Sequence, residues 1–291
     1  MIEVSPGMPQ MDTTQFSWNH VGDSETRKIV YKYITNNNQA AKLAEFIICN
    51  TFYELESPVF AYMPSLLPVG PLITDQRFEK PVGTFWPEDA GCINWLDKQP
   101  ANSVIYVAFG SFTILNRHQF QELALGLELT GRPFLWVVRP DLTNGRDDAY
   151  PMGFRERVAN RGMIVDWSPQ QKVLAHPSIA CFLSHCGWNS TIEGVRNGVP
   201  FLCRPYFTDQ FLNQSYICDV WKIGLRMDSD DTGMIFKEQV KEKVEKLLGD
   251  ESINTRSQRW KEMANESVEE GGSSYNNFNS FISAMKTSNS L

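Results

Sequence analysis

From residue 103 onward, short apolar runs rich in β-branched residues alternate with amphipathic segments. This alternation predicts strand–helix–strand units around a parallel sheet, because the runs have strand length and the segments between them have helical periodicity. The expected strands are residues 104–109, 134–138, 163–165, 180–184 and 199–203. The expected helices are residues 117–129, 170–175, 191–197, 210–221 and 237–248. The sequence therefore predicts an α/β chain with one nearly complete Rossmann-like domain.

The first hundred residues do not predict a second complete domain. They offer one convincing strand at 46–49, which we expect to lack a sheet, and one helix at 26–43. The proline-punctuated stretch 58–87 is typical of a linker. Near the other end, a Ser/Asn-rich segment carries apolar residues at helical spacing, which predict a last docking helix: Phe278, Phe281, Ile282 and Met285.

Composition narrows the class of protein. With 42% hydrophobic and 21% charged residues the chain can bury a globular core, and its net charge of -7 argues against nucleic acid as a partner. No apolar stretch reaches the roughly 18 residues of a membrane span, and the first residues do not resemble a signal peptide. The six cysteines include no C-x-x-C pair, so we expect reduced thiols and a cytoplasmic location.

The segment after the predicted strand 180–184 has the pattern of a phosphate site. Gly187 permits a sharp turn that presents free N–H groups at the start of the next helix, and such a start favours a diphosphate. His185 lies at the carboxyl end of the strand, where its imidazole can hydrogen-bond a phosphate oxygen. In the alternative interpretation Ser190 only caps the helix and Glu193 completes a capping box. The spacing alone leaves both interpretations open.

Other polar residues follow strands in the same way, and each has a structural alternative. Gly110 and Ser111 can add an N–H and a hydroxyl near the phosphates, or form an ordinary loop. Trp167 can stack on a base or simply pack. Asp209 and Gln210 can accept hydrogen bonds from sugar hydroxyls, or cap the following helix.

A metal site is not predicted, although four possible ligands cluster in the sequence: His176, Cys181, His185 and Cys186. Adjacent residues at a strand end point to opposite faces, so His185 and Cys186 cannot easily share a tetrahedral ion. The sequence also lacks the G-x-S-x-G, Walker, H-E-x-x-H and G-x-G-x-x-G motifs. Hydrolase, NTPase and dehydrogenase functions thus lose their main support.

Residues 167–210 as a block resemble the donor-binding signature of the plant family 1 UDP-glycosyltransferases. Residues 49–56, 68–72, 95–97, 107–111 and 270–274 are also similar to that family. The resemblance implies a GT-B fold of two facing Rossmann-like domains. It divides the chain into a remnant of the acceptor-binding domain (1–72), a linker (73–90), the UDP-sugar-binding domain (91–270) and a tail that docks back on the N-terminal part (271–291).

The resemblance also implies a role for individual residues. It assigns the uridine to Trp167, Ser168, Gln170 and Glu193. It assigns the diphosphate to Ser111, His185, Asn189 and Ser190. It assigns the hexose to Trp188, Asp209 and Gln210, and a glutamine at this last position is the family's usual choice for glucose. No cofactor or metal is implied, because the UDP-sugar is a co-substrate.

Two departures from the family pattern stand out. Arg204 replaces a tryptophan beside the loop of Asp209 and Gln210, which predicts weaker donor binding. The family's catalytic histidine and its aspartate partner match nothing in this chain, and His20 lies in a different motif. We therefore expect no catalytic residue here.

The implied activity is inverting, metal-independent transfer of a sugar, with glucose favoured, to a small-molecule hydroxyl in plant secondary metabolism. The acceptor would be a phenolic, flavonoid or terpenoid. Without the base we expect impaired or absent catalysis. The alternatives are an inactive UDP-sugar-binding or interaction protein and an incomplete gene model.

Overall fold

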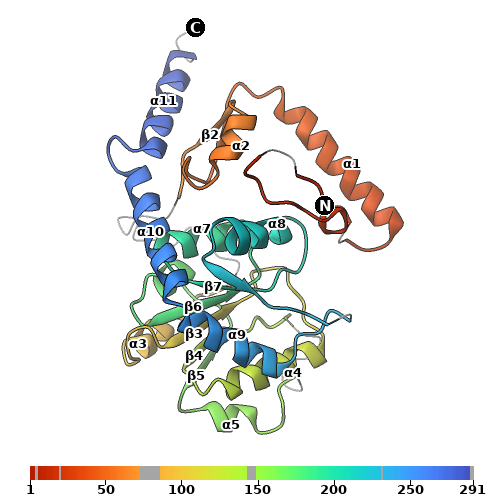
Figure 1. The fold of residues 1–291 in the computed structure, drawn as a ribbon, viewed down its shortest axis with the longest axis vertical. Coiled ribbons are helices and arrows are strands. Elements are labelled where there is room, and N and C mark those ends of the chain that lie inside the picture. Colours follow the sequence, from red (N-terminus) through yellow and green to blue (C-terminus); the bar gives the residue numbers. More distant parts are fainter. Residues whose placement is uncertain (4–5, 20, 73–85, 143–148, 231, 289–291) are drawn as a thin grey trace.

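A parallel sheet forms the centre of the computed structural model, which describes residues 1–3, 6–19, 21–72, 86–142, 149–230 and 232–288. Within these residues the largest sheet has six strands in the order β5-β4-β3-β6-β7-β8 (Figure 1). The strands are β3 (Val104–Ala108), β4 (Phe134–Val137), β5 (Gly162–Val165), β6 (Ile179–Ser184), β7 (Phe201–Cys203) and β8 (Gly224–Arg226). Every neighbouring pair is parallel, so all carboxyl ends lie at one edge.

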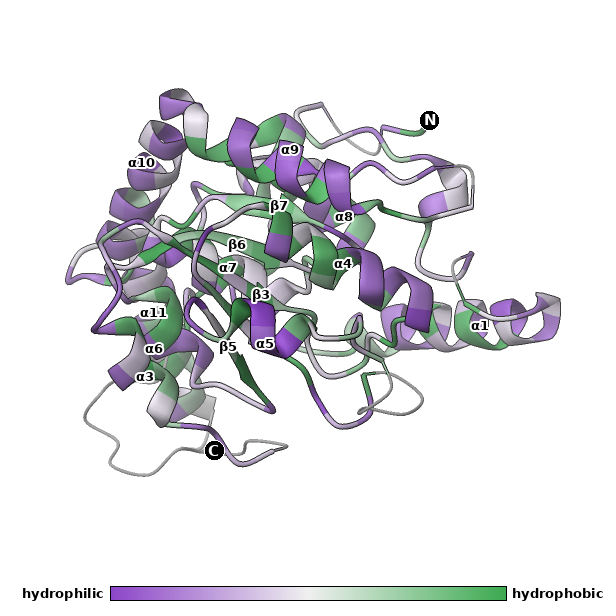
Figure 2. Cartoon of the chain, turned by 90° about the horizontal axis from the view of Figure 1, so that it is seen from below, coloured by the Kyte–Doolittle hydropathy of each residue, from purple (hydrophilic) through white to green (hydrophobic). Residues whose placement is uncertain are grey.

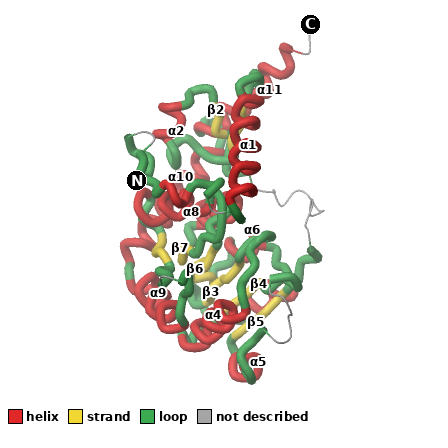
Figure 3. The backbone as a smooth tube through the Cα atoms, turned by 90° about the vertical axis from the view of Figure 1, so that its right-hand side faces the viewer, coloured by secondary structure: helices red, strands yellow, loops and turns green. Residues whose placement is uncertain are grey.

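Helices cover both faces of this sheet, as Figure 3 shows from the side. Successive side chains of β3 alternate between two cores: Tyr106 packs in one cluster, while Ile105 and Val107 pack in the other. Both faces of the strand are therefore buried, which explains its continuous apolar run. The helices of the domain are α3 (Gly91–Leu96), α4 (Arg117–Leu129), α5 (Phe154–Val158), α6 (Gln170–Leu174), α7 (Trp188–Asn197), α8 (Gln210–Ser215), α9 (Lys237–Gly249) and α10 (Glu251–Val268).

The predicted helix 210–221 forms over nearly its whole length, but its second half is π-helical. After α8 the chain widens into a π-helical turn, η2 (Tyr216–Val220), in which the Trp221 N–H donates to the Tyr216 carbonyl at 2.8 Å. This turn keeps both aromatic side chains in the core, each about 2% exposed. Strand β8 and helices α3, α5 and α10 were not predicted. Strand β8 has three residues, α3 has six and α5 has five, which is too short for a clear periodicity, and the sequence of α10 is predominantly polar.

The first part of the chain forms a smaller unit made of η1 (Thr13–Gln15), α1 (Ser24–Ala41), β1 (Ile47–Cys49), α2 (Ser57–Tyr62) and β2 (Leu66–Pro68). Strand β1 pairs in parallel with β2, so the expectation that this strand lacks a sheet is wrong. The predicted linker 58–87 is also wrong at its start, where α2 and β2 form. Its central residues, 73–85, lie outside the described residues.

The last helix, α11 (Ser273–Ser288), lies beside β2 (Figure 1). The Asn277 side-chain amide donates to the Pro68 carbonyl at 2.9 Å, and the rings of Phe46 and Phe281 meet edge to face with centroids 5.8 Å apart. The last helix is therefore joined by direct contacts to the smaller unit that contains β1 and β2. The domain limits at residues 72, 90 and 270 stay predictions.

Helix α1 buries none of its side chains and extends away from the large sheet (Figure 2). Ile29 is 68% exposed and Tyr33 is 67% exposed, and residues four apart share one helix face. Such an apolar face favours association between copies.

We expect the protein to self-associate as its concentration rises, measured by size-exclusion chromatography with light scattering. The variant carrying Ile29→Glu and Tyr33→Glu should shift to a monomer, while Lys28→Glu on the same helix should behave as the unmodified chain. A monomer at every concentration would contradict this prediction.

Candidate functional site

A buried tyrosine links the central strand to the loop after β5. Tyr106 on β3 is 1% exposed, and its hydroxyl lies 2.9 Å from the Ser168 hydroxyl and donates to Gln170 Oε1 at 3.1 Å. Burial raises the pKa of Tyr106, so this hydroxyl stays protonated. Sequence reasoning missed Tyr106 because it lies inside an apolar strand run. It fixes two of the residues that were predicted to hold a uracil base.

The same hydrogen-bonded chain continues to helix α7. Gln170 Nε2 donates to the Ser190 hydroxyl at 2.8 Å and to Glu193 Oε2 at 2.7 Å, while Gln171 Nε2 donates to Glu193 Oε1 at 3.1 Å. Burial raises the pKa of Glu193, and these two amide donors oppose the rise. The carboxylate is thus held by glutamines at the start of α6.

The capping-box interpretation of Ser190 and Glu193 is wrong. Helix α7 begins at Trp188 with Gly187 at its N-cap, so Ser190 is already the third helical residue. Gly187 has no side chain with which to cap the helix start. The first turn therefore presents its N–H groups at the sheet edge, next to His185, as the phosphate interpretation requires.

His185 is a buried neutral imidazole between two glycine turns. It is 9% exposed, and burial lowers its pKa to about 4, although the charge of Asp209 opposes this. Its Nδ1 has no hydrogen-bond partner among the described residues. A Cβ placed on either Gly110 or Gly187 would collide with its Nε2. Both glycines are therefore required by close approach to the ring, and Gly110 also has a φ of +66°.

An unpredicted arginine holds the loop that carries Gly110 and Ser111. Arg139, 2% exposed, donates through Nη1 to the Gly110 carbonyl and through Nη2 to the Thr113 carbonyl at 2.9 Å. Its Nε donates to Asp141 at 2.9 Å. Arg139 follows β4, and the position after a predicted strand was the signal that could have identified it.

The loop between β7 and α8 presents two of the three residues predicted for the hexose. Asp209 is exposed, and its Oδ2 accepts a hydrogen bond from Asn213 Nδ2 at 2.9 Å. Asp209 occupies the N-cap position of α8, as the structural alternative expects, but its side chain makes no capping hydrogen bond there. Gln210 is 4% exposed, and its Oε1 accepts from the N–H groups of Tyr206 and Phe207 at 2.8 and 3.1 Å. Its carboxamide oxygen is therefore already used to shape the loop.

The remaining predicted residues have mixed surroundings. Trp188 is half-buried, and its indole N–H donates to the Asn50 carbonyl at 2.8 Å, which joins α7 to the smaller unit. Asn189 is exposed in the first turn of α7. Trp167 is half-buried and packs against the core that contains Tyr106. Ser111 is half-buried after β3.

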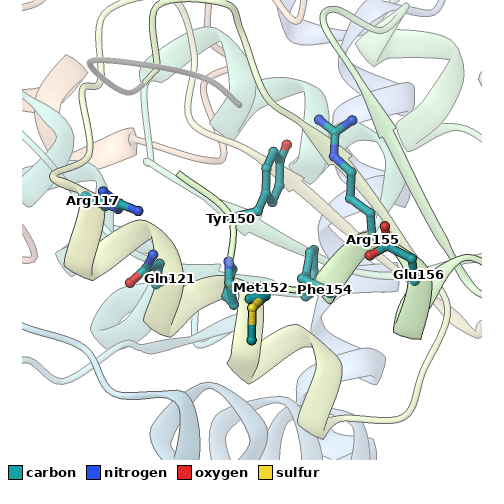
Figure 4. A pocket seen from close by; sticks show the side chains of 9 residues that line it. Arg117, Gln121, Tyr150, Met152, Phe154, Arg155 and Glu156 are labelled. Atoms are coloured by element: carbon teal, nitrogen blue, oxygen red, sulfur yellow. The ribbon is translucent and has the colours of Figure 1, made fainter. Parts of the chain in front are cut away.

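The described chain also has an open pocket of about 540 Å³ between α4 and α5 (Figure 4). Its lining includes Arg117, Gln121 and Tyr150, with the Arg155 guanidinium 4.5 Å from the tyrosine ring centroid. None of the predicted site residues line it. It is therefore separate from the polar edge described above.

Metal-binding clusters and membrane-spanning helices are both absent from the described residues. No group of three or more His, Cys, Asp or Glu side chains there is arranged to hold a metal ion. In the same part of the chain, no helix is both long enough and apolar enough to cross a membrane.

The sheet and its polar edge define a Rossmann-like α/β protein, and comparison with known proteins defines its family. A family model described as UDP-glucoronosyl and UDP-glucosyl transferase matches residues 82–254. UDP-glycosyltransferase 83A1 of Arabidopsis thaliana is 41% identical over 98% of this chain and 60% of its own length. Linamarin synthase 1 of Manihot esculenta is 36% identical, over 97% of this chain and 60% of its own length.

Solved structures agree with these relatives. Os79 from O. sativa in complex with UDP has a TM-score of 0.76 and 35% identity, covering 82% of this chain and 55% of that one. Phytolacca americana UGT2 with UDP-2fluoro-glucose and pterostilbene has a TM-score of 0.84 and 30% identity, covering 97% and 62%. The chain belongs to the family of UDP-glucoronosyl and UDP-glucosyl transferases, and the GT-B fold class is confirmed. It spans about 60% of the length of the curated relatives it matches.

The lowered pKa of His185 predicts a pH-dependent stability. Its pKa falls from 6.5 to about 4 on folding, so the unfolded chain binds the proton more tightly. The free energy of unfolding should therefore decrease as pH falls from about 6.5 toward 4, by on the order of 3 kcal/mol from this group. Urea denaturation at several pH values measures it, and His185→Gln should remove this part of the slope. Parallel pH profiles for both proteins would contradict the assignment.

The contact between Gly110 and His185 can be separated from backbone strain. Gly131 has a similar φ of +68°, but a Cβ there would meet nothing within 4 Å. We expect Gly131→Ala to lower the free energy of unfolding by about 1 kcal/mol, and Gly110→Ala by about 2 kcal/mol more, because its Cβ displaces the imidazole. Chemical denaturation compares the two. Equal losses would show that the ring moves aside without cost.

Proposed function

We propose that this chain binds a UDP-sugar, with UDP-glucose favoured, at the carboxyl edge of its six-stranded sheet. The observation that carries the proposal is the hydrogen-bonded chain from Tyr106 through Gln170 to Glu193, which ends beside the first turn of α7. It brings the residues that resemble a uridine site next to those that resemble a diphosphate site. The similar structures solved with UDP and with UDP-2fluoro-glucose support the same ligand.

Each part of the ligand has a matching surface in this proposal. Trp167 stacks on the base, and Glu193 accepts hydrogen bonds from the ribose hydroxyls. The N–H groups of Asn189 and Ser190 hold the diphosphate through the dipole of α7, which suits a chain of net charge -7. The neutral His185 can donate one hydrogen bond to a phosphate oxygen without adding a charge.

The hexose lies toward the loop between β7 and α8. The exposed carboxylate of Asp209 accepts hydrogen bonds from two sugar hydroxyls, and Asn213 keeps it oriented. The Oε1 atom of Gln210 is occupied, so this residue offers its Nε2 amide to the sugar. Trp188 supplies an apolar surface while its indole N–H stays bonded to Asn50.

The proposed reaction is an inverting sugar transfer to a small-molecule hydroxyl, such as that of a phenolic, flavonoid or terpenoid. The acceptor oxygen forms a bond to the anomeric carbon, and the bond from that carbon to the diphosphate oxygen breaks. UDP leaves with the electron pair, stabilised by α7 and His185. The acceptor proton passes to a general base, for which this chain offers no assigned residue. Such a base contributes about 10² to 10⁴ in rate, so we expect slow transfer by this chain alone.

Calorimetric titration with UDP tests the binding site. We expect saturable binding to the unmodified chain and its loss in the double variant His185→Ala, Glu193→Ala. The variant Gln121→Ala, in the separate pocket between α4 and α5, should keep its UDP affinity. No detectable UDP binding, or unchanged affinity in the double variant, would contradict the proposal.

A radiolabelled UDP-glucose assay on a panel of phenolic acceptors then tests turnover. Slow transfer supports the enzyme. Binding without transfer instead supports a UDP-sugar-binding protein that has no turnover of its own.

A further inference from the structure

Arg204 follows β7 and reaches across the edge where the proposed donor site lies. Its backbone N–H donates to the Ser184 carbonyl at 2.8 Å, which places it beside the residue that precedes His185. Its guanidinium carbon lies 5.9 Å from the ring centroid of Phe109, the residue before Gly110 and Ser111. The side chain thus spans from the end of β7, past β6, to the end of β3.

This guanidinium has no anionic partner among the described residues. Its Nε is buried without a hydrogen-bond partner, and no carboxylate of the described chain forms an ion pair with it. Burial lowers its pKa to about 10, so it still carries its charge at neutral pH. A half-buried cation without a partner is disfavoured, because the hydration that it has lost is not replaced.

The other buried arginine at this edge shows what a structural role looks like. Arg139 is almost fully buried, but its nitrogens bond the carbonyls of Gly110 and Thr113 and the carboxylate of Asp141. All of its nitrogens are used to hold a loop. Within the described ranges the guanidinium of Arg204 meets only the face of Phe109, so its hydrogen-bonding capacity is available to a ligand.

We propose that Arg204 is an anion-binding residue of the donor site, an inference that rests on the proposed UDP-sugar function. Its guanidinium pairs with an oxyanion that the ligand brings, which is either the diphosphate or a carboxylate on the sugar, as in UDP-glucuronic acid. Both present two anionic oxygens to a planar fork of N–H donors. This inference reverses the expectation from the sequence that Arg204 weakens donor binding.

The proposal has a consequence for the free protein. Because the unpaired charge opposes folding until a ligand arrives, Arg204→Gln should unfold at the same temperature as the unmodified chain or higher. Its affinity for the anion should nevertheless fall. A residue needed only for packing would show the opposite pattern, with lower thermal stability and unchanged affinity.

Titration calorimetry with UDP, UDP-glucose and UDP-glucuronic acid tests the pairing. We expect Arg204→Gln to weaken binding by about 10- to 100-fold, the usual effect of losing a charge-assisted hydrogen bond. Arg155→Gln removes the same charge from the exposed pocket helix and should leave all three affinities unchanged. Equal weakening for the three ligands assigns the diphosphate, and weakening confined to UDP-glucuronic acid assigns the carboxylate.

Unchanged affinity for all three ligands in Arg204→Gln would overturn the proposal. If the unmodified chain binds none of them, the proposed function itself fails, and the two failures are thereby distinguished. A second measurement needs no variant: phenylglyoxal modification followed by mass spectrometry. We expect saturating UDP or UDP-glucuronic acid to protect Arg204 but not Arg155. Lack of protection by both ligands would also overturn the proposal.

Discussion

The register between β3 and β6 is the constraint on which the polar edge depends. Ala108 lies opposite Ser184, so the turns that follow the two strands leave the sheet at the same height. Gly110 and His185 are then brought into direct contact, and only a hydrogen atom fits at the glycine. A shift of one residue would turn the imidazole toward the other face of the sheet. The central pairing of the core therefore also fixes the position of the imidazole.

Burial controls the charges at this edge. It keeps the His185 imidazole uncharged near neutral pH and raises the pKa of the Glu193 carboxyl, which two glutamine amides oppose. The dipole of α7 and the N–H groups of its first turn then add a positive potential that does not depend on pH, beside the charge of Arg204. An acidic chain can in this way present a local site for an anion without a cluster of lysines.

The sequence predicted the regular part of this arrangement and missed what depends on distant contacts. Strands such as β3 and β6 have continuous apolar runs, and His185 and Ser111 follow such runs directly, so topology alone places them at one edge. Tyr106 could not be recognised in the same way, because it lies inside a strand and its partner Ser168 is 62 residues away in the chain. The position of Arg139 after a strand was a usable signal, but its bond to Thr113, 26 residues away, was not visible in the sequence. The π-turn after α8 was missed because it depends on the packing of Tyr216 and Trp221. Residue spacing alone could not decide whether Ser190 is the N-cap of α7 or lies inside its first turn. The structure decides it, because Gly187 occupies the N-cap position.

The two arginines at the strand ends show why burial alone does not define a role. Arg139 is the more deeply buried, yet its charge is matched by Asp141 and two carbonyls, so removing it would leave acceptors unpaired. The side chain of Arg204 is only half-buried, yet its removal leaves no acceptor unpaired, because it bonds no acceptor in the part of the chain that the structure describes. Loss of Arg139 should therefore act through the loop that carries Gly110, while loss of Arg204 should act on whatever anion enters the site. A guanidinium group therefore has two different roles at this edge. The role depends on whether acceptors of the folded chain already bond its N–H groups, as they do for Arg139, or leave them for a ligand, as we propose for Arg204.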